Sequence, residues 1–414
     1  MTPREERGLV IAALCKLNRV NNDEWLVPSQ SRGETIYRVN PATQSCTCPD
    51  HLEAGHKCKH LFAVEIVMKR ETRPDGTVIE TKSITFIEKK AFKQNWPAYN
   101  LAQTTEKSRF QTLLNDLCRT LPEPQRPPTR GPKPHLVRDA IFAMVFKVYC
   151  GFSSRRFHTD LQEAFQRGHT TRPIPGMKVT SFHENEDYTL ILIDLIARSA
   201  APLAAVETEF AVDSTGFSTS RFERWFDEKY GVTKRTCMWV KAHVACGVKT
   251  NVVTAVRILE KVSGDSPQFK PLLDETAKRF TVDEFSADAA YASNANFEAV
   301  ANYGGKLYAM FKSNTTGGIG GLFEKMFHYF QWQRDEYLGH YHKRSNVEST
   351  FSAIKRVFGD SVRSKTDAAM KNEVLCKILA HNICCLIHEQ EELGIAPIFW
   401  KDEACNELRA VATN

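Results

Sequence analysis

Five strand-like segments between residues 206 and 313 constrain the fold of this 414-residue chain more than any other feature. Three of them follow one another, with "KTN" (249–251) as a hairpin turn between the second and third. A helical stretch, "SPQFKPLLDETAKR", precedes the fourth strand, and another helix separates the fourth from the fifth. This succession predicts an α/β fold with a mixed sheet. The segments are TEFAVDSTGFS, TCMWVKAHVACGV, NVVTAVRIL, RFTVDEFSADAAY and KLYAMFKS.

Two of these strands end in an aspartate that small residues follow. Asp213 closes "FAVD", and Asp288 closes "EFSAD". Acids just past the ends of apolar strands lie where an open α/β sheet carries its ligand site. For either residue alone, a helix cap or a turn former is the commoner interpretation. The pair therefore needs a third feature before it indicates catalysis.

The third feature is the segment "YHKRSNVESTFSAIK", residues 341–355. Its polar residues Tyr341, Arg344, Glu348 and Lys355 stand at offsets of 0, 3, 7 and 14. At about 100° per residue these offsets fall at roughly 0, −60, −20 and −40° around a helix, so the sequence predicts one helix with all four on a narrow face. That face would carry Glu348 toward the sheet edge.

Three carboxylates in one place repel one another unless cations neutralise them. Two divalent ions roughly 4 Å apart are the arrangement used for in-line attack at phosphodiesters. Carboxylate oxygens favour Mg²⁺ or Mn²⁺. Asp213, Asp288 and Glu348 are thus the expected ligands of two such ions, and Arg344 and Lys355 are suited to hold phosphate.

These residues resemble a known family. Tyr341-x2-Arg344-x3-Glu348-x6-Lys355 looks like the YREK signature of DDE transposases from bacterial insertion sequences. "AVDST" and "SADAAY" resemble the first and second acid motifs of that family, and the similarity extends over about residues 125–390.

The resemblance implies a ribonuclease H-like catalytic core in which the three acids bind metal. It also implies DNA contacts from Tyr341, Arg344 and Lys355. Asp283 and Glu284 are rival second acids, and Asp288 is preferred because Tyr291 follows it at the family spacing.

Two departures from the family pattern stand out. Ala290 occupies a position where many relatives have glycine, and only 59 residues separate Asp288 from Glu348, too few for a large β-rich insertion. Trp332 lies in this short segment, and we expect it to pack in the core rather than to stack on a base.

A cysteine cluster near the N-terminus predicts a second metal site. "SCTCPDHLEAGHKCKHLF" contains Cys46-x-Cys48-x9-Cys58-x-His60. Three thiolates and an imidazole complete a tetrahedral zinc shell with no open position, so the site is expected to be structural. His51 and His56 are alternative ligands in place of His60. The pattern resembles the SWIM zinc finger over about residues 35–70.

The two sites and the composition of the segments between them predict the domain boundaries of the chain. We expect a SWIM-like zinc module at 1–70 with its motif at 46–60, and a connector with a proline-rich linker at 71–134. A helical domain at 135–205 follows, then the catalytic domain at 206–390 and a tail at 391–414. "PDG" at residues 74–76 favours a hairpin turn, and "LPEPQRPPTRGPKP" carries six prolines in fourteen residues.

The helical domain is also the basic part of the chain. Residues 119–178 hold 11 Lys and Arg against 4 Asp and Glu, a balance typical of nucleic-acid binding. Two helices joined at Gly151, with Ser153 or Ser154 as cap of the second and Gly168 as its stop, resemble a helix-turn-helix unit. Arg155 and Arg156 would open the second helix and contact DNA, although an ordinary helical hairpin is the commoner structure.

The sequence therefore predicts a DNA transposase that cleaves and joins the ends of its own mobile element. Its expected partners are double-stranded DNA, both terminal inverted repeats and target, and a second copy of the chain. Two alternatives remain: a silent, domesticated DNA-binding regulator, and another ribonuclease H-like nuclease such as a resolvase. No apolar run approaches a membrane span and no secretory signal is evident, so the expected location is the cytoplasm, on the nucleoid in a prokaryote.

Overall fold

The computed structural model describes most of the chain, in two compact units, Met1–Lys93 and Gln94–Asn414. The described residues are 2–15, 17–21, 23–29, 35–71, 95–119, 121–124, 133–219, 239–259, 264–312, 315 and 320–399. The hairpin expected at residues 74–76 and much of the proline-rich linker lie outside them.

The first unit packs two longer helices and a small antiparallel sheet around one core. Its strands pair in the order β1-β2-β3-β4, and Trp25, Val27 and Val39 are buried. α1 packs closely on α3, because a Cβ at Gly8 would lie only 2.6 Å from the Cβ of Phe62. β3 lies in the segment "ETIYRVN", and α3 contains the segment "HLFAVEIVMKR". The elements are α1 (Pro3–Leu14), β1 (Asn18–Arg19), β2 (Trp25–Pro28), β3 (Ile36–Asn40), β4 (Ser45–Cys46), α2 (Pro49–Ala54) and α3 (Lys59–Glu71).

The second unit contains a five-stranded mixed sheet in the order β7-β6-β5-β8-β9. β5 pairs antiparallel with β6 and parallel with β8, so the expected mixed sheet is confirmed. Asn251, whose φ is +58°, lies in the turn between β6 and β7 that "KTN" predicted. The strands are β5 (Glu209–Ser218), β6 (Trp239–Gly247), β7 (Val253–Leu259), β8 (Glu284–Ala287) and β9 (Lys306–Ala309).

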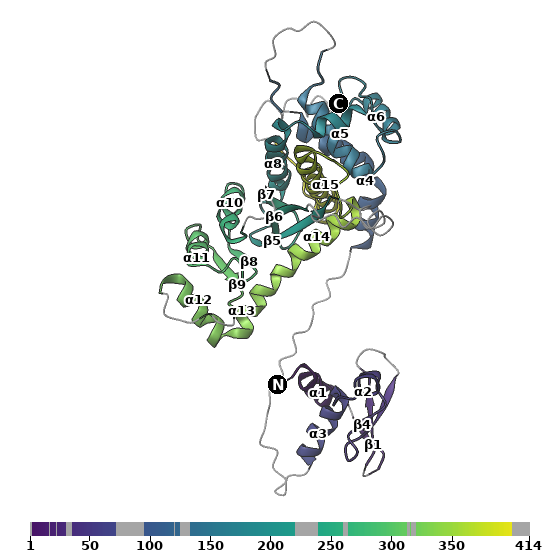
Figure 1. Ribbon diagram of the computed structural model, residues 1–414, viewed down its shortest axis with the longest axis vertical. Helices are drawn as coiled ribbons and strands as arrows, with labels where there is room; N and C mark the ends of the chain where they lie inside the picture. The colour runs from purple at the N-terminus through teal and green to yellow at the C-terminus, as the bar shows by residue number, and fades with distance from the viewer. Residues whose placement is uncertain are drawn as a thin grey trace, which may run out of the picture. The chain divides into compact units, whose positions relative to one another are not determined.

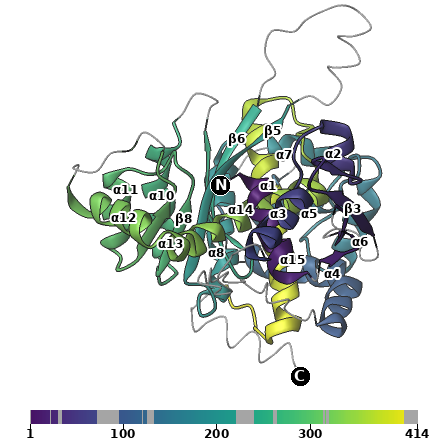
Figure 2. The ribbon, with the colours of Figure 1, turned by 90° about the horizontal axis from the view of Figure 1, so that it is seen from below.

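Two groups of helices flank this sheet (Figures 1 and 2). α10 packs on β6 and β7, and α11 and α13 pack on β9, with α12 beside α11 and α13. α8 and α15 contact β7, α4, α5 and α7 pack on α15, and α6 packs on α5. α14 lies along β5 and β6. The bounds are α4 (Trp96–Cys118), α5 (Val137–Cys150), α6 (Phe157–Gln166), α7 (Lys178–His183), α8 (Asp187–Ala200), η1 (Ala201–Leu203), α10 (Ser266–Ala277), α11 (Asn294–Ala301), α12 (Gly321–Trp332), α13 (Arg334–Tyr341), η2 (His342–Arg344), α14 (Ser345–Phe358) and α15 (Asp367–Leu393).

The long helix α15 joins the helical region to the sheet. It packs on α4, α5, α7 and α8 and also contacts β6 and β7. Because this buried helix serves both regions, the expected domains at 135–205 and 206–390 belong to one compact unit. α4 lies inside the range 71–134 that was expected to be a connector, and α15 extends three residues into the expected tail. In the described part of the chain, no helix combines the length and apolar character that a membrane span requires.

α5 and α6 confirm the two expected helices but correct the start of the second. α5 ends at Gly151 with a φ of +68°, as expected of a C-terminal glycine. α6 begins at Phe157 without a side-chain cap, so neither Ser153 nor Ser154 caps it. The buried Phe157 ring packs edge-on against Phe146 of α5, so the first residue of α6 is anchored in the core.

Asn382 of α15 links three elements through its buried amide. Its Nδ2 donates to the carbonyl oxygens of Ile196 (3.2 Å) and Val253 (2.7 Å) and to Ser199 Oγ (2.9 Å), and its Oδ1 accepts from the Val253 N–H at 2.8 Å. We expect Asn382→Ala to lower the free energy of unfolding by about 3 kcal/mol, because buried backbone groups would lose their partners. Urea unfolding of the full chain measures this, with Asn302→Ala on the surface of the same unit as control; equal stabilities would contradict it.

Candidate active site

Asp213 and Asp288 lie side by side because of the strand register. β5 and β8 run parallel, and the register pairs Glu209 with Glu284 and Val212 with Ala287. One position past the last of these pairs, Asp213 is still in β5 and Asp288 directly follows β8, close enough for its charge to raise the pKa of Asp213. Neighbouring strands lie about 4.8 Å apart, and paired residues face the same side of the sheet. The two acids therefore form one carboxylate pair at the end of β8.

The surroundings of Asp213 are those of a carboxylate close to another negative charge. Burial raises the pKa of Asp213, and the charge of Asp288 raises it further. The Ser214 N–H, which donates to Asp213 Oδ1 at 2.8 Å, and the charge of Arg344 act in the opposite direction. A partly buried pair of acids that repel each other suits a bound cation.

Arg344 connects the first acid to the third. Its Nη2 donates to Asp213 Oδ2 at 2.9 Å, and its Nη1 lies 2.9 Å from Glu348 Oε1, one turn along α14. The Glu348 side chain is 57% exposed, whereas those of Arg344 and Asp213 are 22% and 16% exposed. One guanidinium thus lies between the two carboxylates. Among the described residues, the carboxylate oxygens of Asp213, Asp288 and Glu348 do not form a group close enough to bind one ion in this arrangement.

Lys355 lies further along the same side of α14. Its Nζ donates to Thr215 Oγ1 at 2.6 Å and lies 5.5 Å from the centre of the Phe217 ring. Burial lowers the pKa of Lys355. The structure therefore brings Lys355, like Arg344, to β5.

The predicted single helix over 341–355 is wrong. Tyr341 ends α13, the 3-10 turn η2 follows, and α14 begins only at Ser345. Lys343, in this turn, lies 2.7 Å from Glu209 and 2.7 Å from Glu284. These ion pairs to the sheet offset the poorer hydrogen-bond geometry of the tighter turn. Tyr341 remains near Arg344, whose pKa it helps to raise.

The ion pairs of Lys343 belong to a cluster that the sequence analysis missed. His340 Nδ1 also lies 2.9 Å from Glu284, and its ring stacks on Tyr308 with 4.4 Å between centroids. A signal was present in the sequence, because Glu209 and Glu284 each precede a site aspartate by four residues. Because residues an even number apart in a strand face the same side, each glutamate lies on the same face of the sheet as its aspartate.

The remaining expected residues have varied surroundings. Asp283 is exposed, so it lacks the partly buried setting of Asp213. Arg155 and Arg156 are exposed in the turn before α6 rather than inside the helix. The prediction for Trp332 is wrong: its side chain is 80% exposed at the end of α12 and stacks on His328 with 5.0 Å between ring centroids.

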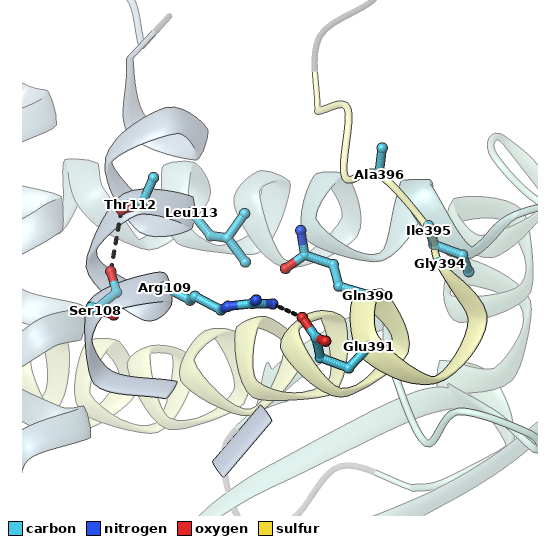
Figure 3. A pocket seen from close by; sticks show the side chains of 9 residues that line it. All are labelled: Ser108, Arg109, Thr112, Leu113, Gln390, Glu391, Gly394, Ile395 and Ala396. Carbon is cyan, nitrogen blue, oxygen red and sulfur yellow. Dashed lines mark hydrogen bonds and ion pairs between the residues drawn. The ribbon is translucent and has the colours of Figure 1, made fainter. Parts of the chain in front are cut away.

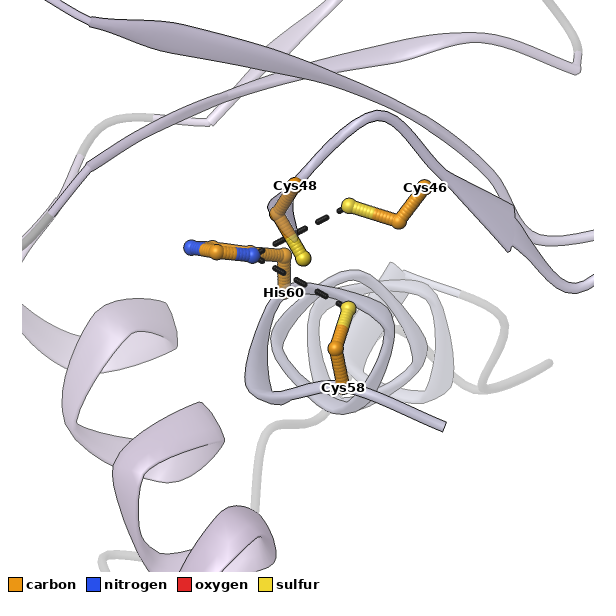
Figure 4. A group of neighbouring side chains, drawn as sticks. All are labelled: Cys46, Cys48, Cys58 and His60. Atoms are coloured by element: carbon orange, nitrogen blue, oxygen red, sulfur yellow. Dashed lines mark hydrogen bonds between the residues drawn. The ribbon is translucent and has the colours of Figure 1, made fainter. Parts of the chain in front are cut away.

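The four zinc-ligand candidates form one buried cluster in the first unit (Figure 4). Cys46 ends β4 and Cys48 precedes α2, while Cys58 precedes α3 and His60 lies in its first turn. His60 Nδ1 lies 3.8 Å from both the Cys46 and the Cys58 sulfur, and all four ligand atoms lie within 4.8 Å of one another. Ligands of one tetrahedral zinc, at bonds of about 2.0–2.3 Å, lie roughly 3.5–3.8 Å apart.

The donor set of this cluster fits a zinc ion. A hydrogen bond between the Cys46 and Cys58 thiols lowers the pKa of Cys58 and raises that of Cys46, and three sulfurs with one imidazole are the soft donors of structural zinc sites. His51 and His56 do not belong to the cluster, since His51 Nδ1 lies 2.9 Å from the His56 carbonyl oxygen instead. The residues chosen from the spacing are thus the ones that come together.

A pocket of about 510 Å³ lies between α4 and the end of α15 (Figure 3). Arg109 and Glu391 form an ion pair across it. None of the expected site residues lines this pocket, and its paired charges leave no net attraction for a phosphate. It gives no alternative to the acids at the sheet.

A family model and a solved structure are similar to this chain. Residues 205–383, which contain the five strands and the three acids, match the family model described as "Transposase DDE domain". Among solved structures, the chain is similar to the cryo-EM structure of a piggyBac transposase synaptic complex with hairpin DNA, at 10% sequence identity and a TM-score of 0.33, over 74% of this chain and 78% of that one. A comparison of the sequence with curated proteins gave no match. On the family match, residues 205–383 of this chain form a transposase DDE domain, the catalytic domain of a DDE transposase enzyme.

Proposed function

We propose that this transposase cleaves phosphodiesters at the ends of a mobile element and transfers the strands, with Asp213, Asp288 and Glu348 as the catalytic acids. The observation that supports this most is the register of β5 and β8, which sets two aspartates side by side. α14 adds Glu348, and the Arg344 guanidinium lies between Glu348 and Asp213. The mixed sheet also fits a ribonuclease H-like core.

The donor set of this site fits divalent cations. It consists of three carboxylates, whose hard oxygens favour Mg²⁺ or Mn²⁺. When bound, two such ions supply activation of the attacking water or 3′-hydroxyl and stabilisation of the leaving oxygen. The chain itself orients Asp213 through the Ser214 N–H. Arg344 offers a planar fork for phosphate, and Lys355 offers a point charge.

We further propose how the chain engages DNA. Tyr341, Arg344 and Lys355 contact DNA next to the acids. The exposed Arg155 and Arg156 contact backbone phosphates in the end sequence. The cluster of the first unit holds one structural zinc, and its module takes part in recognising the ends. Holding two ends together favours a homodimer on DNA, and the protein acts in the cytoplasm, on the nucleoid in a prokaryote.

Binding at different salt concentrations tests the two arginines. We expect Arg155→Ala/Arg156→Ala to weaken binding to all sequences alike and to reduce the slope of log K against log[salt] by about 2, one for each lost phosphate contact. Lys270→Ala/Lys278→Ala, which removes two exposed charges from α10 and its C-cap, is the control. An unchanged slope would show that Arg155 and Arg156 lie off the DNA.

Cleavage assays distinguish the proposed activity from its alternatives. Purified protein is incubated with labelled DNA from the flanking element ends in Mg²⁺ or Mn²⁺. The proposal expects nicks at the ends that leave 3′-hydroxyl groups. Binding without cleavage in either metal would indicate a silent regulator. Cleavage confined to branched DNA of any sequence would indicate a resolvase.

A further inference from the structure

We infer that Arg344 competes with divalent cations for Asp213 and Glu348, so that DNA binding and cation binding at the three acids assist each other. The inference rests on the proposed function, because it assumes that these acids bind metal. It assigns Arg344 a task beyond contacting DNA: its guanidinium has two alternative partners, the carboxylates and a phosphate.

The first step is the geometry of the bridge. Each terminal nitrogen of Arg344 binds a different carboxylate at 2.9 Å, one on the sheet and one on α14. The guanidinium occupies the space between these two carboxylates and pairs with the negative charge of both. A cation that bridges both carboxylates from the same position has to displace the guanidinium, while each carboxylate keeps a second oxygen that Arg344 does not contact.

The second step concerns how readily the guanidinium leaves. Arg344 Nε is buried and has no hydrogen-bond partner among the described residues. An unpaired buried donor costs about 1–3 kcal/mol, which makes the bridging position less favourable than two short ion pairs suggest. Both ion pairs are single contacts rather than a two-pronged fork. A phosphate, which accepts such a fork, is a better partner.

The third step concerns what stays in place when Arg344 moves. The preceding residue, Lys343, is held by Glu209 and Glu284 at 2.7 Å each. Rotation of the Arg344 side chain alone can therefore release the acids while the backbone of η2 remains fixed to the sheet. Lys355 differs, because its partner Thr215 is a neutral hydroxyl rather than a proposed metal ligand.

Together these contacts couple the two ligands. A DNA phosphate that draws Arg344 away frees Asp213 and Glu348 for cations, and cations that occupy the acids free Arg344 for phosphate. Linkage requires the two effects to be equal in size. This competition would weaken the binding of catalytic ions by the acids until DNA is present.

Mn²⁺ binding to the full-length protein, followed by electron paramagnetic resonance with and without end DNA, tests the inference. We expect Arg344→Gln to bind Mn²⁺ about tenfold more tightly than the wild type when DNA is absent, within the range typical of such couplings. DNA should raise the Mn²⁺ affinity of the wild type but not of Arg344→Gln. Arg344→Lys, which keeps one charge but cannot bridge both acids, should lie between them.

Two controls separate the possible failures. Arg356→Gln makes the same change on the exposed side of α14 and should bind Mn²⁺ like the wild type. Asp213→Asn should lose the binding in every background. If Asp213→Asn loses it while Arg344→Gln binds no more tightly than the wild type, the competition is overturned and the proposed function stands. If Asp213→Asn changes nothing, the ions bind elsewhere and both proposals fail.

Discussion

Replacing Asp213 with asparagine should lower the rate of DNA strand cleavage by at least about a thousandfold, roughly 4 kcal/mol of transition-state stabilisation. Asparagine keeps the size and shape of the side chain but removes the negative charge that neutralises a cation. It also keeps an oxygen that can accept the Ser214 N–H, so the end of β5 should remain in place. Single-turnover cleavage of labelled end DNA measures the rate, and a binding assay on the same DNA should show little loss.

Asp283→Asn is the matched control for this experiment. Asp283 lies five residues before Asp288, is exposed, and fixes its neighbourhood through its backbone, whose N–H donates to the Thr208 carbonyl at 2.8 Å. The same substitution there should leave cleavage within a few-fold of the wild type. A large loss for Asp283→Asn with little loss for Asp288→Asn would mean that the second acid was assigned wrongly.

Replacing Cys58 with alanine, or removing metal with a strong chelator, should unfold the first unit while the second stays folded. Structural zinc contributes about 10 kcal/mol or more to the folding of small modules. The core around Trp25 and Val39 is too small to compensate. Hydrogen exchange of the full chain should show amides of β2 and β3 losing protection, while those of α15 keep theirs.

His56→Ala is the control for the zinc prediction, since His56 was a candidate ligand but is exposed outside the cluster. The zinc content should remain near one ion per chain in His56→Ala and fall to near zero in Cys58→Ala. If the first unit keeps its exchange protection in Cys58→Ala without bound metal, the cluster does not stabilise the fold.

Local patterns predicted much of the fold because they depend on near neighbours. The five strands follow from short apolar runs bounded by turn residues, and the "KTN" turn places Asn251 at a positive φ that asparagine tolerates. The candidate zinc ligands follow in the same way, since two residue pairs, each close in sequence, determine which atoms can meet. In both cases the information lies within a few residues.

Predictions that needed long-range contacts were less successful. α4 was missed inside the expected connector because the partner that buries it, α15, lies some 270 residues further along. Helical periodicity placed Tyr341 on the same helix as Glu348. Ion pairs between Lys343 and two strands instead hold a tighter turn between them. Trp332 looked like a core residue by its type, yet it lies exposed at a helix end.

By itself, the amino-acid sequence predicted a set of candidate side chains: three acids at strand and helix positions, two cations near them, and four candidate zinc ligands. Only the tertiary structure decided how they meet. The parallel register of β5 and β8 sets Asp213 beside Asp288, and the packing of α14 on β5 inserts Arg344 between Asp213 and Glu348. The physical reason is that strand register and helix packing depend on burial of surface from distant parts of the chain, which no short stretch of residues contains.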